Sequence, residues 1–117
     1  MFMDNPLFLI PLLVGGVFLF IGFLFYQFPP KKINGLYGYR TPASMESQER
    51  WDFAQKYSSV EMMKSGLLLL LLCLPGLIFF PPREAAVFIG LGLMLLVVII
   101  MIVRVERAIK RKFGAVK

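Results

Sequence analysis

The fold of this chain is decided by residues 85–103, which read AAVFIGLGLMLLVVIIMIV. These 19 residues carry no charge, and a helix of about 20 apolar residues crosses the hydrocarbon core of a bilayer. Lipid offers the backbone no hydrogen-bond partner, so a spanning segment is either a helix or part of a closed barrel. The alternating pattern of a barrel strand is not present in the sequence. The segment is therefore predicted to be a transmembrane helix.

Two more apolar segments lie upstream. Residues 6–28 form a run of 23 residues in which Gln27 is the only strongly polar member. The other apolar segment, residues 66–80, is only 15 residues long. It reaches spanning length only if the helix starts near residue 60, with Glu61 and Lys64 extending to the headgroups. We therefore predict an all-α integral membrane protein with three transmembrane helices, at about residues 6–28, 60–80 and 85–103.

The composition supports a membrane protein. The 117 residues are 58% hydrophobic and 17% charged, whereas soluble domains average about 45–50% and about 25%. A soluble core of this size could not bury so much apolar surface. The single cysteine, Cys73, excludes a disulfide scaffold and is expected to be a small packing residue. A cleaved signal peptide is not expected, because the chain starts acidic and its first apolar run is too long.

The basic residues alternate between the connections. Residues 29–65 and the tail 104–117 hold 12 of the 13 lysines and arginines, and the hairpin after the second span holds Arg83 alone. The positive-inside rule then places the N-terminus outside, the loop 29–59 inside, the hairpin outside and the C-terminus inside. Anionic headgroups explain the basic tail, and no direct contact with nucleic acid is expected.

The inner loop carries several turn signals. Pro29-Pro30 ends the first helix, Asn34-Gly35 indicates a turn, and Gly38 allows a second backbone reversal or a close approach. A helix restarts near Thr41-Pro42, with the threonine hydroxyl as N-cap and the proline at the first helical position. Ser44 is an alternative cap, and the sequence does not decide between them.

The next segment, about residues 43–65, has an amphipathic helical pattern. Such a helix lies along the headgroup boundary or packs under the bundle, and it could bend at Ser65-Gly66 into the second span. Two pairs of opposite charge four residues apart are expected on it, Glu46–Arg50 and Asp52–Lys56. An aromatic belt at the inner boundary is expected from Tyr26, Tyr37, Tyr39, Trp51 and Tyr57.

Arg40 is the most informative residue of the loop. Its guanidinium could contact a partner carboxylate, a peptide terminus or a lipid phosphate. It could instead hold the shape of the loop by binding helix C-terminal carbonyls or one of the nearby acids, Glu46, Glu49 and Asp52. We favour the structural role, although both could hold together.

Glycines in the spans indicate close helix packing. Gly15 and Gly22 are seven residues apart and share one face of the first span. Others allow close approach too: Gly16, Gly66, Gly76, Gly90 and Gly92, together with Cys73. These positions suit packing within the chain, and also a homo-oligomer or a larger membrane complex. Pro75 is expected to kink the second span.

The run Ile33-Asn34, then Tyr37-Gly38-Tyr39-Arg40-Thr41-Pro42-x-Ser44, followed by Trp51 and Ala54, resembles the SdpI family. These are bacterial membrane proteins named after an immunity protein against a sporulation-delaying peptide toxin. The resemblance covers the family's C-terminal three-span module as one domain over residues 1–117, a short form without the founding member's extra N-terminal spans. The candidate motif and partner-binding residues are Asn34, Tyr37, Gly38, Tyr39, Arg40, Thr41, Pro42, Ser44 and Trp51.

The resemblance implies a multi-pass protein of the bacterial cytoplasmic membrane that binds or neutralises a membrane-active peptide toxin, or signals its presence to a cytoplasmic regulator. The chain has no histidine, no phosphate-binding glycine loop and no CxxC pair, so we expect neither an enzyme nor a cofactor. The alternative is a non-catalytic accessory subunit that stabilises a larger membrane complex through its glycine-lined spans.

Overall fold

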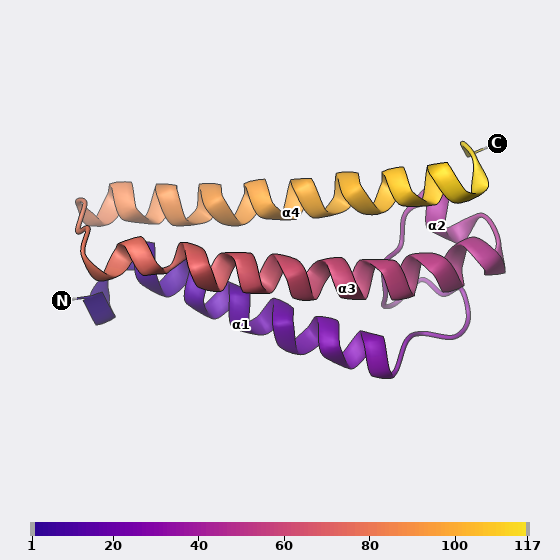
Figure 1. Cartoon of the computed structure of the whole chain (residues 1–117), viewed down its shortest axis with the longest axis horizontal. Helices are drawn as coiled ribbons and strands as arrows, with labels where there is room; N and C mark the ends of the chain where they lie inside the picture. Colours follow the sequence, from indigo (N-terminus) through magenta and orange to yellow (C-terminus); the bar gives the residue numbers. More distant parts are fainter. Residues whose placement is uncertain (1, 117) are drawn as a thin grey trace.

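Three long helices lie side by side in the computed structural model, which describes residues 2–116 (Figure 1). They are α1 (Pro6–Gln27), α3 (Gln48–Leu72) and α4 (Arg83–Phe113). The shorter elements are η1 (Phe2–Asp4), α2 (Pro42–Met45) and η2 (Leu74–Leu77). Within the described residues there are no strands, and three helical stretches are long and apolar enough to cross a membrane: Pro6–Gln27, Gln48–Leu77 and Arg83–Phe113. The predicted three-span helical fold is confirmed.

The first span ends as the sequence predicts. Asn5 caps the start of α1, where its side-chain oxygen accepts the Leu7 N–H at 3.2 Å. The helix stops at Gln27, two residues before Pro29-Pro30, which could not continue the backbone ladder.

The amphipathic segment and the second span are one continuous helix. α3 begins at Gln48, where the Ser47 hydroxyl accepts the Arg50 N–H, and runs without interruption to Leu72. The segment expected as an interfacial helix over residues 43–65 is therefore divided between α2 and the larger, first part of α3, and the helix is not interrupted at Ser65-Gly66. Gly66 instead serves helix packing. The break lies upstream, between α2 and α3, because Ser47 has an extended backbone.

Two other boundaries differ from the prediction. Pro75 does not kink the second span, because α3 has already ended and the proline lies in the 3-10 turn η2. α4 extends ten residues beyond the predicted end of the third span, so most of the basic tail is helical. Lys117, the last residue of that tail, lies outside the described residues.

Glycine faces bring α1 and α3 close together. A Cβ on Gly15 would lie 2.8 Å from the Gly66 carbonyl oxygen, and one on Gly66 would lie 2.7 Å from that of Gly15. Two turns further along α1, a Cβ on Gly22 would lie 2.9 Å from the Ser59 carbonyl oxygen. The shared face of Gly15 and Gly22 is thus used for packing within the chain. Gly16 and Gly92 face open space.

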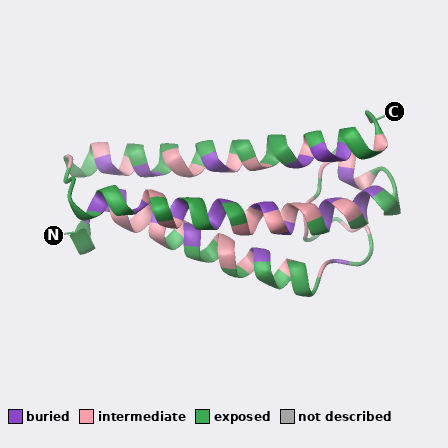
Figure 2. Ribbon diagram, viewed as in Figure 1, coloured by how far each residue is buried: buried purple, intermediate pink, exposed green. Residues whose placement is uncertain are grey.

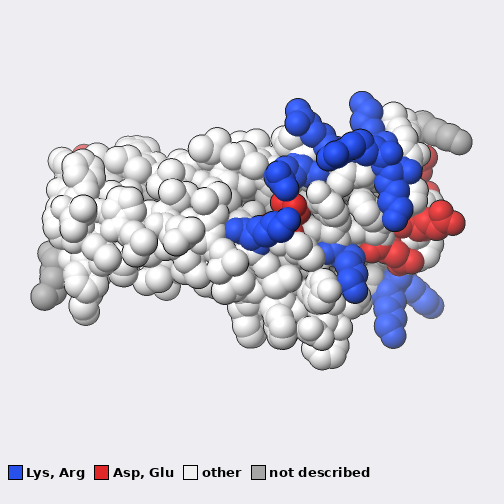
Figure 3. All heavy atoms as spheres, in the orientation of Figure 1, with Lys and Arg blue, Asp and Glu red and all other residues white. Residues whose placement is uncertain are grey.

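Buried side chains concentrate on the inward faces of the helices and around α2 (Figure 2). A cluster of Ala54, Val105 and Ile109 joins α3 to α4 beside α2. This end of the bundle, which holds α2, the start of α3 and the end of α4, also carries most of the lysines and arginines visible in Figure 3; we call it the charged end. Along the rest of the bundle, large aliphatic side chains face outward, as expected for a surface in lipid.

Glu61 is held within the chain by an ion pair with α4. Its side chain is buried and accepts two bonds from Arg104 of α4, at 2.8 and 3.2 Å. The sequence alone could not show that α4 would bring a guanidinium to this position.

Candidate functional site

The loop between α1 and α2 starts with the predicted turn. The Asn34 side-chain oxygen accepts the N–H groups of Leu36 and Tyr37, both at 2.9 Å. Its amide group donates to the Lys32 carbonyl at 2.9 Å. Asn34 therefore shapes an exposed turn through its own side chain.

Gly38 makes the second backbone reversal, and both readings of this glycine hold. Its φ of 107° belongs to the left-handed region that favours glycine. A Cβ here would lie 2.7 Å from the Gln55 side-chain oxygen and 2.8 Å from Cγ of Pro30. The position thus demands both the backbone freedom and the small size of glycine.

Gln55 of α3 holds the loop backbone. Its amide group donates to the Tyr39 carbonyl at 2.8 Å, and its oxygen accepts the Tyr39 N–H at 2.7 Å. The side chain is buried, and both its amide group and its oxygen take part in this two-way pairing. We did not select Gln55 from the sequence, although its spacing of four from Trp51 places the two on one helix face.

Trp51 anchors the same loop one turn earlier in α3. The indole N–H donates to the Pro30 carbonyl at 2.7 Å, and the ring is fully buried. The expectation that Trp51 belongs to an aromatic belt at the membrane boundary is therefore wrong. A buried indole needs an acceptor for its N–H, and the carbonyl of Pro30, which lies beyond the end of α1, supplies one.

Glu106 of α4 fixes the other side of the loop. One carboxylate oxygen accepts the hydroxyl groups of Tyr39 and Thr41, each at 3.0 Å. Burial, and next the negative charge and hydrogen bond of Glu106, raise the pKa of the Tyr39 phenol above its ordinary value. In the sequence, Glu106 lies within the basic tail, and nothing local connects it with residues 65 positions upstream.

Thr41 and Ser44 act together at the start of α2. The Thr41 hydroxyl accepts the Ser44 N–H at 3.2 Å, and the Ser44 hydroxyl accepts the Thr41 N–H at 2.9 Å. This reciprocal capping box resolves the choice that the sequence left open. Pro42 occupies the first helical position, as predicted.

Arg40 lies on the surface of the loop. Its Nη1 donates to the Gly35 carbonyl at 2.6 Å, which closes the turn around Asn34. Among residues 2–116 it forms no ion pair with Glu46, Glu49 or Asp52, so the expected acidic partners are wrong. The structural role favoured for Arg40 is present, with a loop carbonyl as its partner.

Arg50 is the arginine that binds helix-terminal carbonyls. Its buried guanidinium donates to the carbonyls of Phe113, Gly114 and Ala115 at 2.9–3.3 Å, and it lies 3.9 Å from Glu46, as the four-residue spacing predicted. It thereby ties the end of α4 to the start of α3.

The second predicted pair, Asp52–Lys56, does not form among the described residues. Asp52 accepts a bond from Gln48, and the Lys56 ammonium lies over the Tyr26 ring.

The candidate residues therefore divide into two groups. Those that pin the loop are Gly38, Tyr39, Thr41, Ser44 and Trp51. The remaining ones, Asn34, Tyr37, Arg40 and Pro42, lie at or near the surface, beside the highly exposed Leu36. The result is a rigid loop with a small exposed face of apolar, aromatic and cationic groups. Residues 2–116 contain no group of three or more histidines, cysteines or acids that could hold a metal ion.

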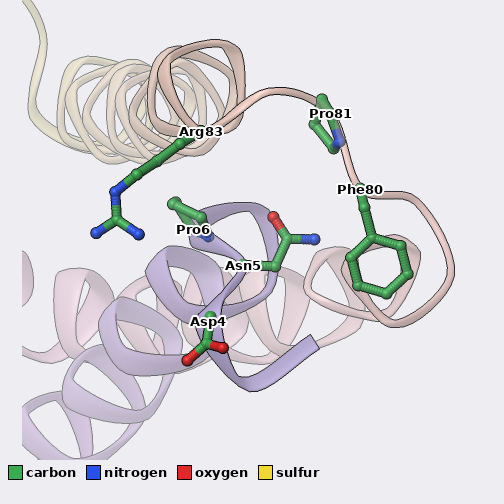
Figure 4. A pocket seen from close by; sticks show the side chains of 6 residues that line it. All are labelled: Asp4, Asn5, Pro6, Phe80, Pro81 and Arg83. Atoms are coloured by element: carbon green, nitrogen blue, oxygen red, sulfur yellow. The ribbon is translucent and has the colours of Figure 1, made fainter. Parts of the chain in front are cut away.

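The opposite end of the bundle is held by Asn5. Its amide group donates to the carbonyls of Gly76 and Phe79 at 3.0 and 2.8 Å, which ties the start of α1 to the connection before α4. Beside it is a cavity of about 170 Å³, and Figure 4 shows the residues that line it: Asp4, Asn5, Pro6, Phe80, Pro81 and Arg83. Asn5 thus has a structural role that sequence analysis missed.

Comparison with known proteins gives two matches. A model of the SdpI/YfhL protein family matches residues 31–105. This range includes α2, α3, most of α4 and residues 31–41 of the connection between α1 and α2, which we call the pinned loop. The uncharacterized protein YfhL of Bacillus subtilis (strain 168) is 47% identical over 55 residues, which cover 47% of this chain and 50% of that protein. The similarity thus spans about half the length of this relative. No solved structure matches the chain.

Proposed function

Because this chain belongs to the SdpI/YfhL protein family, we propose that it is an immunity-type protein of the bacterial cytoplasmic membrane that binds or neutralises a membrane-active peptide toxin. The observation that carries the proposal is the pinned loop within the family match. Gln55 and Trp51 hold it from α3, and Glu106 holds it from α4. A surface held in this way binds a partner without a large loss of conformational entropy.

The exposed face of the loop suits a peptide partner. Arg40 donates one N–H group to Gly35, which leaves its other donors for a peptide carboxylate or carbonyl. Leu36 and Tyr37 beside it are largely exposed and offer apolar and aromatic contacts. The same face could instead contact a cytoplasmic regulator that reports the presence of the toxin.

The distribution of charge supports an orientation for this function. Lysines and arginines gather at the charged end in Figure 3, and such an excess favours the cytoplasmic side. We propose that the pinned loop faces the cytoplasm, where it would meet a peptide that has inserted across the membrane.

The test is survival of a toxin-sensitive strain that lacks its own immunity protein. A peptide toxin of the sporulation-delaying type is titrated against cells with and without this chain. We expect the chain to raise the tolerated concentration, and Arg40→Ala to abolish that rise at equal membrane levels. Lys32→Ala removes the same charge from an exposed side chain of the same loop and should preserve protection.

Two outcomes would count against the proposal. Equal survival with and without the chain, despite correct membrane insertion, would show that the chain gives no immunity against this toxin. Full protection by Arg40→Ala would show that the exposed face of the loop is not the surface that binds the toxin. A stable complex with another membrane protein after mild detergent extraction, without protection, would favour the accessory-subunit alternative.

A further inference from the structure

A group of three charged side chains joins α3 to α4 away from the pinned loop. The buried Glu61 carboxylate accepts bonds from Nε and Nη2 of Arg104, at 2.8 and 3.2 Å. Nζ of Lys64 lies 3.6 Å from the same carboxylate. Two cations thus share one anion, and the group keeps one excess positive charge.

The depth of this group in the membrane determines how strongly its excess charge attracts an anion. Nineteen uncharged residues, 85–103, separate Arg104 from the opposite end of α4, and at 1.5 Å per residue they span about 28 Å. This distance places the guanidinium near the boundary between hydrocarbon and phosphates. An unbalanced charge attracts an anion more strongly there than in bulk water, because the effective dielectric constant is lower.

An open groove continues from the charges toward the membrane interior. It has a volume of about 230 Å³. Its charged lining is Lys64, Arg104 and the Glu61 carboxylate that they share, and its other lining residues are Ser65, Leu68, Val97, Ile100 and Met101. On α3 and on α4, these residues lie between the charged group and the end of the bundle that holds the η2–α4 connection. The groove is therefore cationic where phosphates lie and mainly apolar where acyl chains lie.

Both cations remain accessible from the lipid. The side chains of Lys64 and Arg104 are 63% and 54% exposed, whereas that of Glu61 is only 5% exposed. The two bonds to Glu61 leave Nη1 of Arg104 for another acceptor.

We propose that this groove binds one anionic phospholipid, with its phosphate at Lys64 and Arg104 and an acyl chain along Leu68, Val97 and Ile100. Charge complementarity selects an anionic headgroup. The apolar continuation of the groove selects a lipid over a free phosphate ion. This site is independent of the proposed immunity function, since it uses neither the loop nor a toxin.

Thermal unfolding of the full chain in a neutral detergent tests the proposal. We would titrate dioleoyl phosphatidylglycerol, dioleoyl phosphatidylcholine and inorganic phosphate separately and follow helix content by circular dichroism. A ligand that binds the folded state raises Tm in a saturable manner. We expect this rise with phosphatidylglycerol alone. An equal rise with phosphatidylcholine, or with inorganic phosphate, would overturn the assignment.

Variants then locate the site. Lys64→Gln keeps the bonds between Glu61 and Arg104, so the fold should persist while the apparent Kd for phosphatidylglycerol rises about fivefold. Arg111→Gln is the matched control, because it removes the same charge from an exposed side chain two turns further along α4. We expect its Kd to stay close to that of the wild type. An equal effect of both variants would indicate diffuse charge attraction and overturn the site.

A second variant keeps every charge. Leu68→Trp places a larger side chain in the groove at a position that is already partly exposed, so folding should persist. We expect it to weaken phosphatidylglycerol binding as strongly as Lys64→Gln. Unchanged binding by a folded Leu68→Trp protein would show that no acyl chain occupies the groove.

Discussion

At the scale of single residues, the loop depends most sharply on Gly38. Gly38→Ala would require a left-handed backbone with a Cβ and would place that atom against Gln55 and Pro30. We expect a loss of about 1–3 kcal/mol in the free energy of unfolding, measured by denaturation in detergent. Gly35→Ala is the control, because a Cβ there meets nothing within 4 Å. A similar loss in both variants would contradict this account.

Tyr39 provides a prediction about pH. Burial, and next Glu106, raise the pKa of its phenol. The stabilising effect of the protonated phenol is therefore complete below the ordinary tyrosine pKa of about 10 and is lost as the pH rises through the higher folded-state value. In a spectrophotometric titration, Tyr39→Phe should therefore leave the tyrosine ionisation below about pH 10 unchanged. If the Tyr39→Phe protein ionised one tyrosine fewer than the wild type in that range, the pKa of the Tyr39 phenol would not be raised, contrary to this prediction.

The sequence revealed the local chemistry of the loop but not its distant partners. Thr41 and Ser44 were both identified from the sequence as candidate caps, and the structure shows that the two residues, three apart, cap together. Glu106 acts on Tyr39 across 67 positions, and only the docking of α4 brings the two together. Arg40 and Arg50 have the same chemistry, and the fold alone determines that Arg50 is the buried one.

At the scale of the helices, the contact between α1 and α3 depends on two glycines. Gly66→Ala places a Cβ 2.7 Å from the Gly15 carbonyl oxygen, which belongs to a helical backbone and cannot move alone. We expect the two helices to separate locally, with a loss of about 1–3 kcal/mol in unfolding free energy in detergent. Gly92→Ala on α4, where a Cβ meets open space, should leave stability unchanged or slightly higher. Equal stability of Gly66→Ala and wild type would refute this packing.

Periodicity predicted which segments are helical better than where each helix begins. The length of their apolar runs identified α1 and α4, because a membrane span needs about 20 consecutive apolar residues and few other structures contain such a run. The continuity of α3 could not be predicted in this way, since its first half is polar and its second half apolar. Gly66 was predicted as a position of close approach, and the structure adds its partner, Gly15 of α1. Ser47 as the cap of α3 becomes evident only in the structure.

At the scale of the whole molecule, the distribution of charge and of packing divides the bundle into two parts. The charged end buries Trp51, Ala54 and Ile109 in a small core of the kind found in water-soluble proteins. Toward the other end, glycines join α1 to α3, and most large aliphatic side chains face outward. The hydrophobic effect can drive packing only in the first part, because the second is surrounded by lipid.

This division makes orientation in the membrane a direct test of the charge pattern. In a Cys73→Ala background, Glu84→Cys would place a thiol at the start of α4, opposite the charged end, and Lys112→Cys would place one at the charged end. Both positions are exposed. We expect a membrane-impermeant maleimide to label Glu84→Cys in intact cells, and Lys112→Cys only after permeabilisation. The Cys73→Ala chain alone should remain unlabelled. Labelling of Lys112→Cys in intact cells would place the pinned loop outside and would move any contact with a peptide toxin to the outer face.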